Sequence, residues 1–287
     1  MLALQLLVNG IVTGSALGVV AISFALIYAT TRVFHVAHAG VYTLGGYLAW
    51  SLVQRGLPVM AALPLAMAGC VAVGCLIQSL LYAPLARRGA AQLVVLIASL
   101  GALAVIQNLI SAVYSPDILE FSSPWASRVV ALPGGLRLTG VQITTVLLDF
   151  VAFAATLLFA HRTLLGKRIR AVASNPFLAE ITRLEPRLVH LYVMAIASAL
   201  VCLPGVLGPL DYGLQPYGGI TPLLTATIAM IAGGIGSLAG AFTLAVAIVV
   251  LQNLALLVMP GEWTIGVTFA IFVVFMLFRP RGLFAGR

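Results

Sequence analysis

Charged residues divide the chain into long uncharged runs. Seven runs contain no Asp, Glu, Lys or Arg: 1–31, 33–54, 56–86, 89–116, 188–210, 212–261 and 263–278. A helix that crosses a bilayer needs about 20 mainly apolar residues. Together with 138–161, which only Asp149 interrupts, the runs predict about nine spans: 5–30, 36–53, 59–82, 92–113, 141–161, 188–208, 221–239, 241–258 and 263–278. The second and last are short, so eight spans plus a re-entrant piece is an equal alternative.

Composition supports the same class of protein. Of 287 residues, 62% are hydrophobic and 8% are charged, whereas a soluble domain carries about 25% charged residues. Helices that satisfy their own backbone groups are the structure that fits lipid. The prediction is an all-α membrane protein, a polytopic bundle of about 8–9 helices, with one transmembrane domain over 1–287.

The basic residues predict the orientation. The net charge of +8 reports topology here rather than nucleic-acid binding, because basic residues concentrate in cytoplasmic loops. With nine spans and a cytoplasmic C-terminus, only Arg55, Arg128 and Arg137 of the 15 Lys and Arg residues fall outside. This asymmetry favours an outside N-terminus and a cytoplasmic C-terminus.

Two hydrophilic loops interrupt the apolar pattern. The external loop, 114–140, is rich in proline and glycine, which predicts turns and a short irregular lid. In the internal loop, 162–187, Ile169, Val172 and Ala173 share one helical face, and Asn175-Pro176 predicts a break before a second helical turn. Such helices would form a docking surface for a cytoplasmic partner; the alternative is a basic loop resting on anionic lipid headgroups.

Small residues recur at helical spacing. Gly10, Gly14 and Gly18 repeat every four residues, which lets helix backbones approach closely. The run 233–240 contains four glycines and predicts a tight inner turn between the seventh and eighth spans.

Motifs for catalysis are absent from the sequence. Lys167 is the only lysine, and no phosphate-binding G-x-x-x-x-G-K-[ST] loop surrounds it. No hydrolase or metalloprotease motif occurs, and the three cysteines fall inside spans without metal-ligand spacing. The chain is therefore predicted not to be an enzyme and to hold no cofactor or metal.

Several polar residues lie inside the spans. Asp149 is a functional candidate because an intramembrane acid is costly; a structural hydrogen bond, or a position nearer the outer interface, is the alternative. His35 and His38 favour helix capping or interhelical hydrogen bonds over metal ligation. The amide pairs Gln107-Asn108 and Gln252-Asn253 fit either interhelical hydrogen bonding or a translocation path.

These residues resemble those of the branched-chain amino acid ABC transporter permeases of the LivH type. The resemblance runs along the whole chain, and its order and spacing are more specific than any one piece. It is carried by Asn9-Gly10 with Gly14 and Gly18, Arg32 to His38, Leu44 to Tyr47, Leu96 to Gly101 with Gln107-Asn108, Gly166 with Arg170-Ala171 and Asn175-Pro176, Tyr212-Gly213, Gly233 to Ser237, Gly240-Ala241, and Arg279 to Phe284.

The resemblance implies an importer subunit in the bacterial cytoplasmic (inner) membrane. Its partners would be a LivM-type permease, two ATP-binding subunits that hold ATP and Mg, and an external substrate-binding protein. The internal loop would be the coupling loop that seats on an ATPase, with Gly166, Arg170, Ala171, Asn175, Pro176 and Ala179 as its residues. Spans two, four and seven would line the substrate path, with His38, Gly45, Gln107, Asn108 and Thr225 as candidates.

Departures from the family pattern leave the solute open. Arg183-Leu184-Glu185 replaces the usual Gly-Ile-Asn, Ala39-Gly40 replaces Gly-Asp, and Thr225 stands where a lysine is frequent. Branched-chain amino acids or a related small amino-acid-like solute are expected. A secondary transporter or channel that works without ATPases and couples through Asp149 is the alternative; a membrane scaffold without transport has little support.

Overall fold

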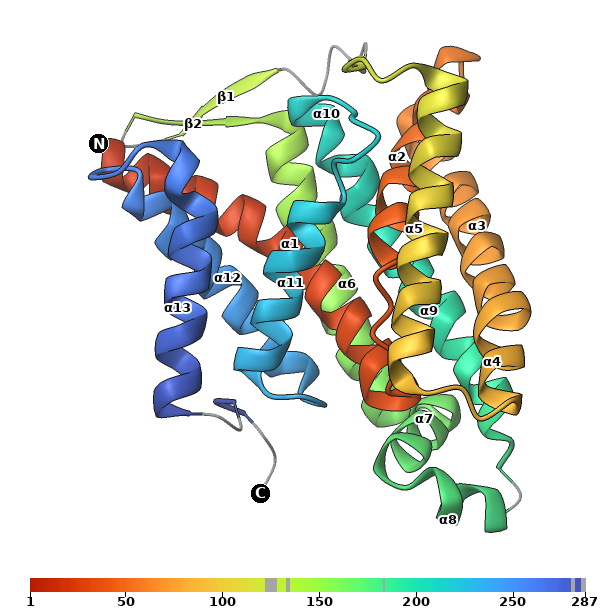
Figure 1. Ribbon diagram of the computed structural model, residues 1–287. Coiled ribbons are helices and arrows are strands. Elements are labelled where there is room, and N and C mark those ends of the chain that lie inside the picture. Colours follow the sequence, from red (N-terminus) through yellow and green to blue (C-terminus); the bar gives the residue numbers. More distant parts are fainter. Residues whose placement is uncertain (122–127, 133–134, 183, 280–281, 285–287) are drawn as a thin grey trace.

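The structure, a computed structural model, describes residues 1–287 except 122–127, 133–134, 183, 280–281 and 285–287. It is a helical bundle with one two-stranded sheet (Figure 1). The elements in order are α1 (Leu2–Thr31), α2 (His38–Gln54), α3 (Val59–Leu76), the π-helix η1 (Ile77–Tyr82), α4 (Ala83–Arg87), α5 (Gln92–Tyr114), β1 (Val129–Leu132), β2 (Leu136–Thr139), α6 (Gly140–Arg162), α7 (Leu164–Ser174), α8 (Pro176–Ile181), α9 (Pro186–Leu207), α10 (Pro209–Tyr212), α11 (Ile220–Gly233), α12 (Leu238–Ala255), the 3₁₀ helix η2 (Gly261–Trp263) and α13 (Thr264–Phe278).

The bundle has two distinct ends (Figure 1). The hairpin end carries β1, β2 and α10, and the α8 end carries α7 and α8. Helix α1 begins at the hairpin end, crosses the bundle obliquely and ends beside α7. Within the described residues, seven helical segments are long and apolar enough to cross a membrane, while α2 and α11 are shorter, at 17 and 14 residues. The prediction of a polytopic helical protein is therefore confirmed, with the β1–β2 hairpin as a departure from an all-α chain.

Most predicted spans coincide with helices, and one end differs. The span predicted to reach residue 239 is wrong there, because α11 already ends at Gly233. Gly234 and Gly236 adopt φ of 103° and 97°, a backbone region that favours glycine. The predicted tight turn is confirmed, and the tail closes over it: Leu283 N donates to Ala232 O at 2.9 Å and Phe284 N to Gly233 O at 3.0 Å.

The core lies around α1, which packs along α12. A Cβ added to Gly10 would lie 2.8 Å from the Val250 Cα, and one added to Gly14 would lie 2.9 Å from the Val246 Cα. At Gly18 the added atom would meet the Phe242 ring at 2.5 Å. The predicted close approach of backbones at these glycines is confirmed.

The external loop is more ordered than the sequence predicts. Strands β1 and β2 form an antiparallel hairpin from Val129↔Thr139 to Leu132↔Leu136, so the expectation of turns and a short irregular lid is wrong for this part of the loop. Ladder hydrogen bonds between short apolar runs outweigh the proline and glycine signal. Thr139 then caps α6 through a capping box with Gln142. Pro124, Pro133 and Gly134, on which the turn prediction drew, lie outside the described residues.

Candidate functional site

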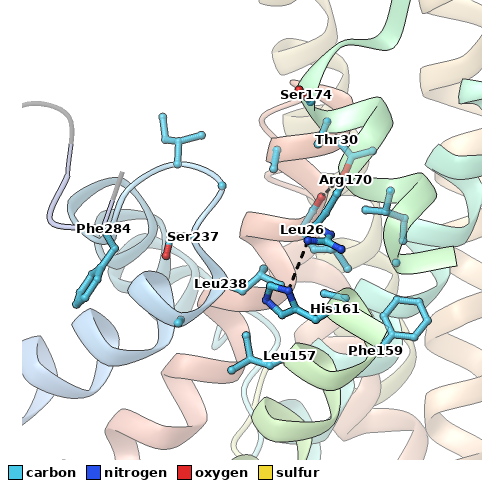
Figure 2. A pocket seen from close by; sticks show the side chains of 18 of the residues that line it. Leu26, Thr30, Leu157, Phe159, His161, Arg170, Ser174, Ser237, Leu238 and Phe284 are labelled. Atoms are coloured by element: carbon cyan, nitrogen blue, oxygen red, sulfur yellow. Dashed lines mark hydrogen bonds between the residues drawn. The ribbon is translucent and has the colours of Figure 1, made fainter. Parts of the chain in front are cut away.

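A cavity of about 670 Å³ opens at the α8 end, beside α7 (Figure 2). Its walls are the inner parts of α1, α6 and α7, the 235–239 turn and Phe284. Arg170 reaches into it, and its Nη1 lies 3.5 Å from Nδ1 of His161. This α7-side cavity is therefore bordered by the 162–187 loop and by the ends of α1 and α6 next to it.

The internal loop folds as its pattern predicts. Helix α7 is amphipathic, with Ile169 and Val172 buried. Asn175 ends α7 and caps α8: its Oδ1 accepts a hydrogen bond from Leu178 N at 3.1 Å. Pro176, which has no N–H to satisfy, fits the first helical position that follows. The predicted break between two short helices is confirmed.

The proposed coupling residues do not form one surface. Gly166 packs so tightly on α6 that a Cβ would lie 2.3 Å from Phe159 O. Ala179 is buried, Ala171 is exposed, and Arg170 points into the cavity. Gly166 and Ala179 are therefore packing positions of α7 and α8, and the coupling role of the six residues stays a prediction.

The exposed surface of α8 instead carries three large apolar side chains, together with Glu180. Phe177, Leu178 and Ile181 are 69%, 57% and 64% exposed. We call these three side chains the α8 tip. Sequence reasoning missed them, although three large apolar residues beside a helix cap in a hydrophilic loop were a readable signal.

The Asn175 cap is expected to stabilise α8 and so the conformation of the α8 tip. Replacing Asn175 by alanine removes the acceptor of the Leu178 N–H and should cost α8 about 1 kcal/mol of local stability. Hydrogen exchange of the α8 amides should then speed up roughly fivefold, while N175D, which retains an acceptor, should leave exchange near the wild-type rate. Equal exchange in N175A and wild type would show that the cap does not hold α8.

A second cavity, of about 400 Å³, lies toward the hairpin end. Parts of α1, α2, α6, α10, α11, α12 and α13 line it, with polar groups from Tyr42, Thr145, Tyr212, Thr225 and Gln252. Its volume and mainly apolar walls with a few polar groups are typical of small-molecule sites. We call it the hairpin-side cavity.

The five path candidates are not brought together. Thr225 lines the hairpin-side cavity. Gly45 is buried, where a Cβ would lie 2.8 Å from Cys202 Sγ. Gln107 is buried within the bundle, and Asn108 is exposed and donates to Ala104 O at 2.8 Å. Only Thr225 among these four residues meets a described cavity.

The fifth candidate, His38, belongs to a buried polar network. His38 Nε2 lies 2.8 Å from Ser23 Oγ, and His35 Nδ1 lies 2.6 Å from Tyr82 Oη. Tyr82, in the π-helix, donates to Ser99 Oγ at 2.7 Å. The interpretation of the two histidines as interhelical hydrogen-bonding groups is confirmed, and the described residues hold no cluster of three or more metal-ligating side chains.

Asp149 lies near the middle of α6 rather than at its end and is fully buried. Its Oδ2 lies 3.1 Å from Ser15 Oγ on α1, which confirms a hydrogen bond between helices. The same Ser15 hydroxyl donates to Val12 O at 2.8 Å, so its single proton is shared. Asp149 Oδ1 has no partner among the described residues.

A bundle of apolar helices long enough to cross a membrane, with a cavity toward each end, has the architecture of a polytopic membrane protein. Residues 6–276 match the family described as "Branched-chain amino acid transport system / permease component". The chain therefore belongs to this permease family, and the resemblance to LivH-type permeases is confirmed.

Individual relatives align with this chain over nearly its whole length. The high-affinity branched-chain amino acid transport system permease protein BraD of Pseudomonas aeruginosa is 28% identical, over 98% of this chain and 95% of BraD. LivH of Escherichia coli is 26% identical, over 98% of this chain and 94% of LivH.

A solved structure shares the fold. PsaBC from Streptococcus pneumoniae in complex with Fab aligns with a TM-score of 0.53 over 95% of this chain and 91% of that chain. At 14% identity, this likeness concerns the fold alone.

Proposed function

We propose that this chain is the permease subunit of an ATP-driven importer for branched-chain amino acids or a related small amino-acid-like solute. The α8 tip is the observation that carries the proposal. Phe177, Leu178 and Ile181 project from the described bundle next to a basic helix, and exposed apolar groups of this kind mark protein–protein contacts. An ATP-binding subunit is the partner that the family membership supports.

Energy for transport comes from those partners. The sequence carries no phosphate-binding loop, so ATP and Mg bind in the two ATP-binding subunits. A second, LivM-type permease and an external substrate-binding protein complete the assembly. The α8 end faces the cytoplasm of a bacterial inner membrane, because Lys167, Arg168 and Arg170 lie there.

The two cavities support alternating access. The hairpin-side cavity receives solute from the binding protein, and the α7-side cavity releases it inside. Because α7 is part of the inner cavity wall, a movement of the docked α8 tip reaches that wall directly. ATP binding and hydrolysis shift the equilibrium between the two states through their different contacts at the tip.

Purification from the native host in mild detergent tests this function. We expect two ATP-binding subunits and a second permease to accompany the chain in equal proportions, as judged by mass spectrometry. The complex in vesicles, with its binding protein and enclosed ATP, should accumulate labelled leucine, isoleucine or valine. A chain that purifies alone and transports without ATP would contradict the proposal and favour a secondary transporter or channel.

A further inference from the structure

Helices α1 and α6 each line both cavities, along different parts of their length. On α1 the hairpin-side cavity contacts residues 12–17, near the middle of the helix, and the α7-side cavity contacts residues 26–30 and the adjoining Arg32. On α6 the corresponding residues are 141–145 and 157–161. The stretches between them line neither cavity, so a solute that passes from one cavity to the other along these helices has to cross this closed region.

A four-residue stripe on α6 runs through the closed region. Thr145 lines the hairpin-side cavity and Leu157 the α7-side cavity; Asp149 and Phe153 lie between them on the same helical face. The ring of Phe153 stacks on Phe242 of α12, with centroids 4.0 Å apart and planes 10° apart. Phe242 in turn fits against Gly18 of α1, so this aromatic stack closes the region on the inner side of Asp149.

Asp149 therefore lies between an open cavity and an aromatic barrier. It is one helical turn from Thr145, which lines the hairpin-side cavity. One carboxyl oxygen shares a serine proton, and the other has no described partner. A buried carboxylate with so few donors is costly unless a cation or a further donor reaches it.

The charge of the cavity determines which solute group fits. The described residues that line it include Asp211 and no Lys, Arg or His. A carboxylate or phosphate would meet only neutral hydroxyl and amide donors there. A cation instead meets Asp211 beside Gln142 and then, further along α6 and one turn beyond Thr145, Asp149. The apolar side chains of Val12, Leu17 and Leu207 remain available for an aliphatic group.

We propose that Asp149, held by Ser15, is the subsite for the primary ammonium group of the transported amino acid, just outside the Phe153–Phe242 barrier. This inference rests on the proposed importer function and adds the chemical feature that the permease itself selects. The ammonium N–H groups donate to Asp149 Oδ1 when the cavity opens one turn further inward. A charge-assisted hydrogen bond then replaces the missing partner.

Uptake of labelled leucine by the assembled complex in vesicles tests the subsite, with ATP hydrolysis measured in parallel. D149N should lower leucine uptake roughly tenfold or more, while hydrolysis stimulated by the binding protein continues. S15A, which keeps the carboxyl group but removes its described donor, should lower uptake several-fold. D117N, the same exchange at an exposed loop position, is the matched control and should transport as wild type does.

The possible outcomes distinguish the Asp149 subsite from the proposed importer function. Wild-type uptake by D149N, or a parallel loss of uptake and hydrolysis in an assembled D149N complex, would overturn the subsite and leave the importer function standing. If the D149N permease does not assemble with its partner subunits, uptake by the S15A complex tests the Asp149 subsite. Uptake by S15A at the wild-type rate would then overturn the subsite. A wild-type complex that takes up no leucine, isoleucine or valine would overturn the proposed solute and the subsite together.

Discussion

Replacing Phe177, Leu178 and Ile181 together by alanine is expected to abolish ATP-driven uptake while leaving the permease folded. Burial of each such side chain at an interface contributes roughly 1.5 kcal/mol or more, so the triple variant should lose about 4 kcal/mol of docking free energy. That is about a thousandfold in the dissociation constant. Because the three side chains are exposed in the bundle, their removal should change its own stability by less than about 0.5 kcal/mol.

Co-purification of the ATP-binding subunits and leucine uptake are the two measurements. L164A is the matched control, because Leu164 is a large apolar residue on neighbouring α7 and is also exposed. It should keep both partners and transport. Retention of the ATP-binding subunits by the triple variant would place the docking surface elsewhere, and the polar residues of α7 would be the next to test.

The fold was largely readable because lipid constrains sequence strongly. Uncharged runs located nearly every long helix, and Asn175-Pro176 located the break between α7 and α8. The span bounds drawn from uncharged runs extended α11 too far, because Gly234 to Ser237 is as uncharged as a span, although its glycines already indicated a turn. The positive φ of Gly234 stops the helix. Composition alone does not report that conformation.

The candidate site was less readable, because it depends on which helix faces meet. Gln107 and Asn108 are adjacent in sequence, yet one is buried and the other is exposed. In the sequence, Gly45 looks like a glycine that could line a substrate path, but in the structure it allows close packing against Cys202. The surroundings of Asp149 follow only from the fold, which places Ser15 of α1 beside it and stacks Phe242 of α12 on Phe153 one turn away. Contacts among three helices produce no periodic pattern in the sequence.

Replacing Gly14 by leucine is expected to prevent stable packing of α1 on α12. Even a Cβ at Gly14 would lie 2.9 Å from the Val246 Cα and 3.2 Å from the Val246 carbonyl oxygen, and backbone atoms of a packed helix cannot move aside as a flexible side chain can. Overpacking of this kind costs about 3 kcal/mol or more. The thermal midpoint of the detergent-purified protein should fall by several degrees, and much of the protein should aggregate.

Gly101 gives the matched control, because it lies on α5 with no heavy atom within 4 Å of an added Cβ. G101L removes a helix-breaking glycine from a surface that already faces outward, so it should be neutral or stabilise by up to about 1 kcal/mol. The same substitution is thus expected to lower stability at Gly14 and to keep or raise it at Gly101. This difference separates the effect of the α1–α12 contact from the effect of helix propensity. Equal midpoints for G14L and G101L would mean that α1 and α12 do not approach closely at Gly14 in the membrane protein.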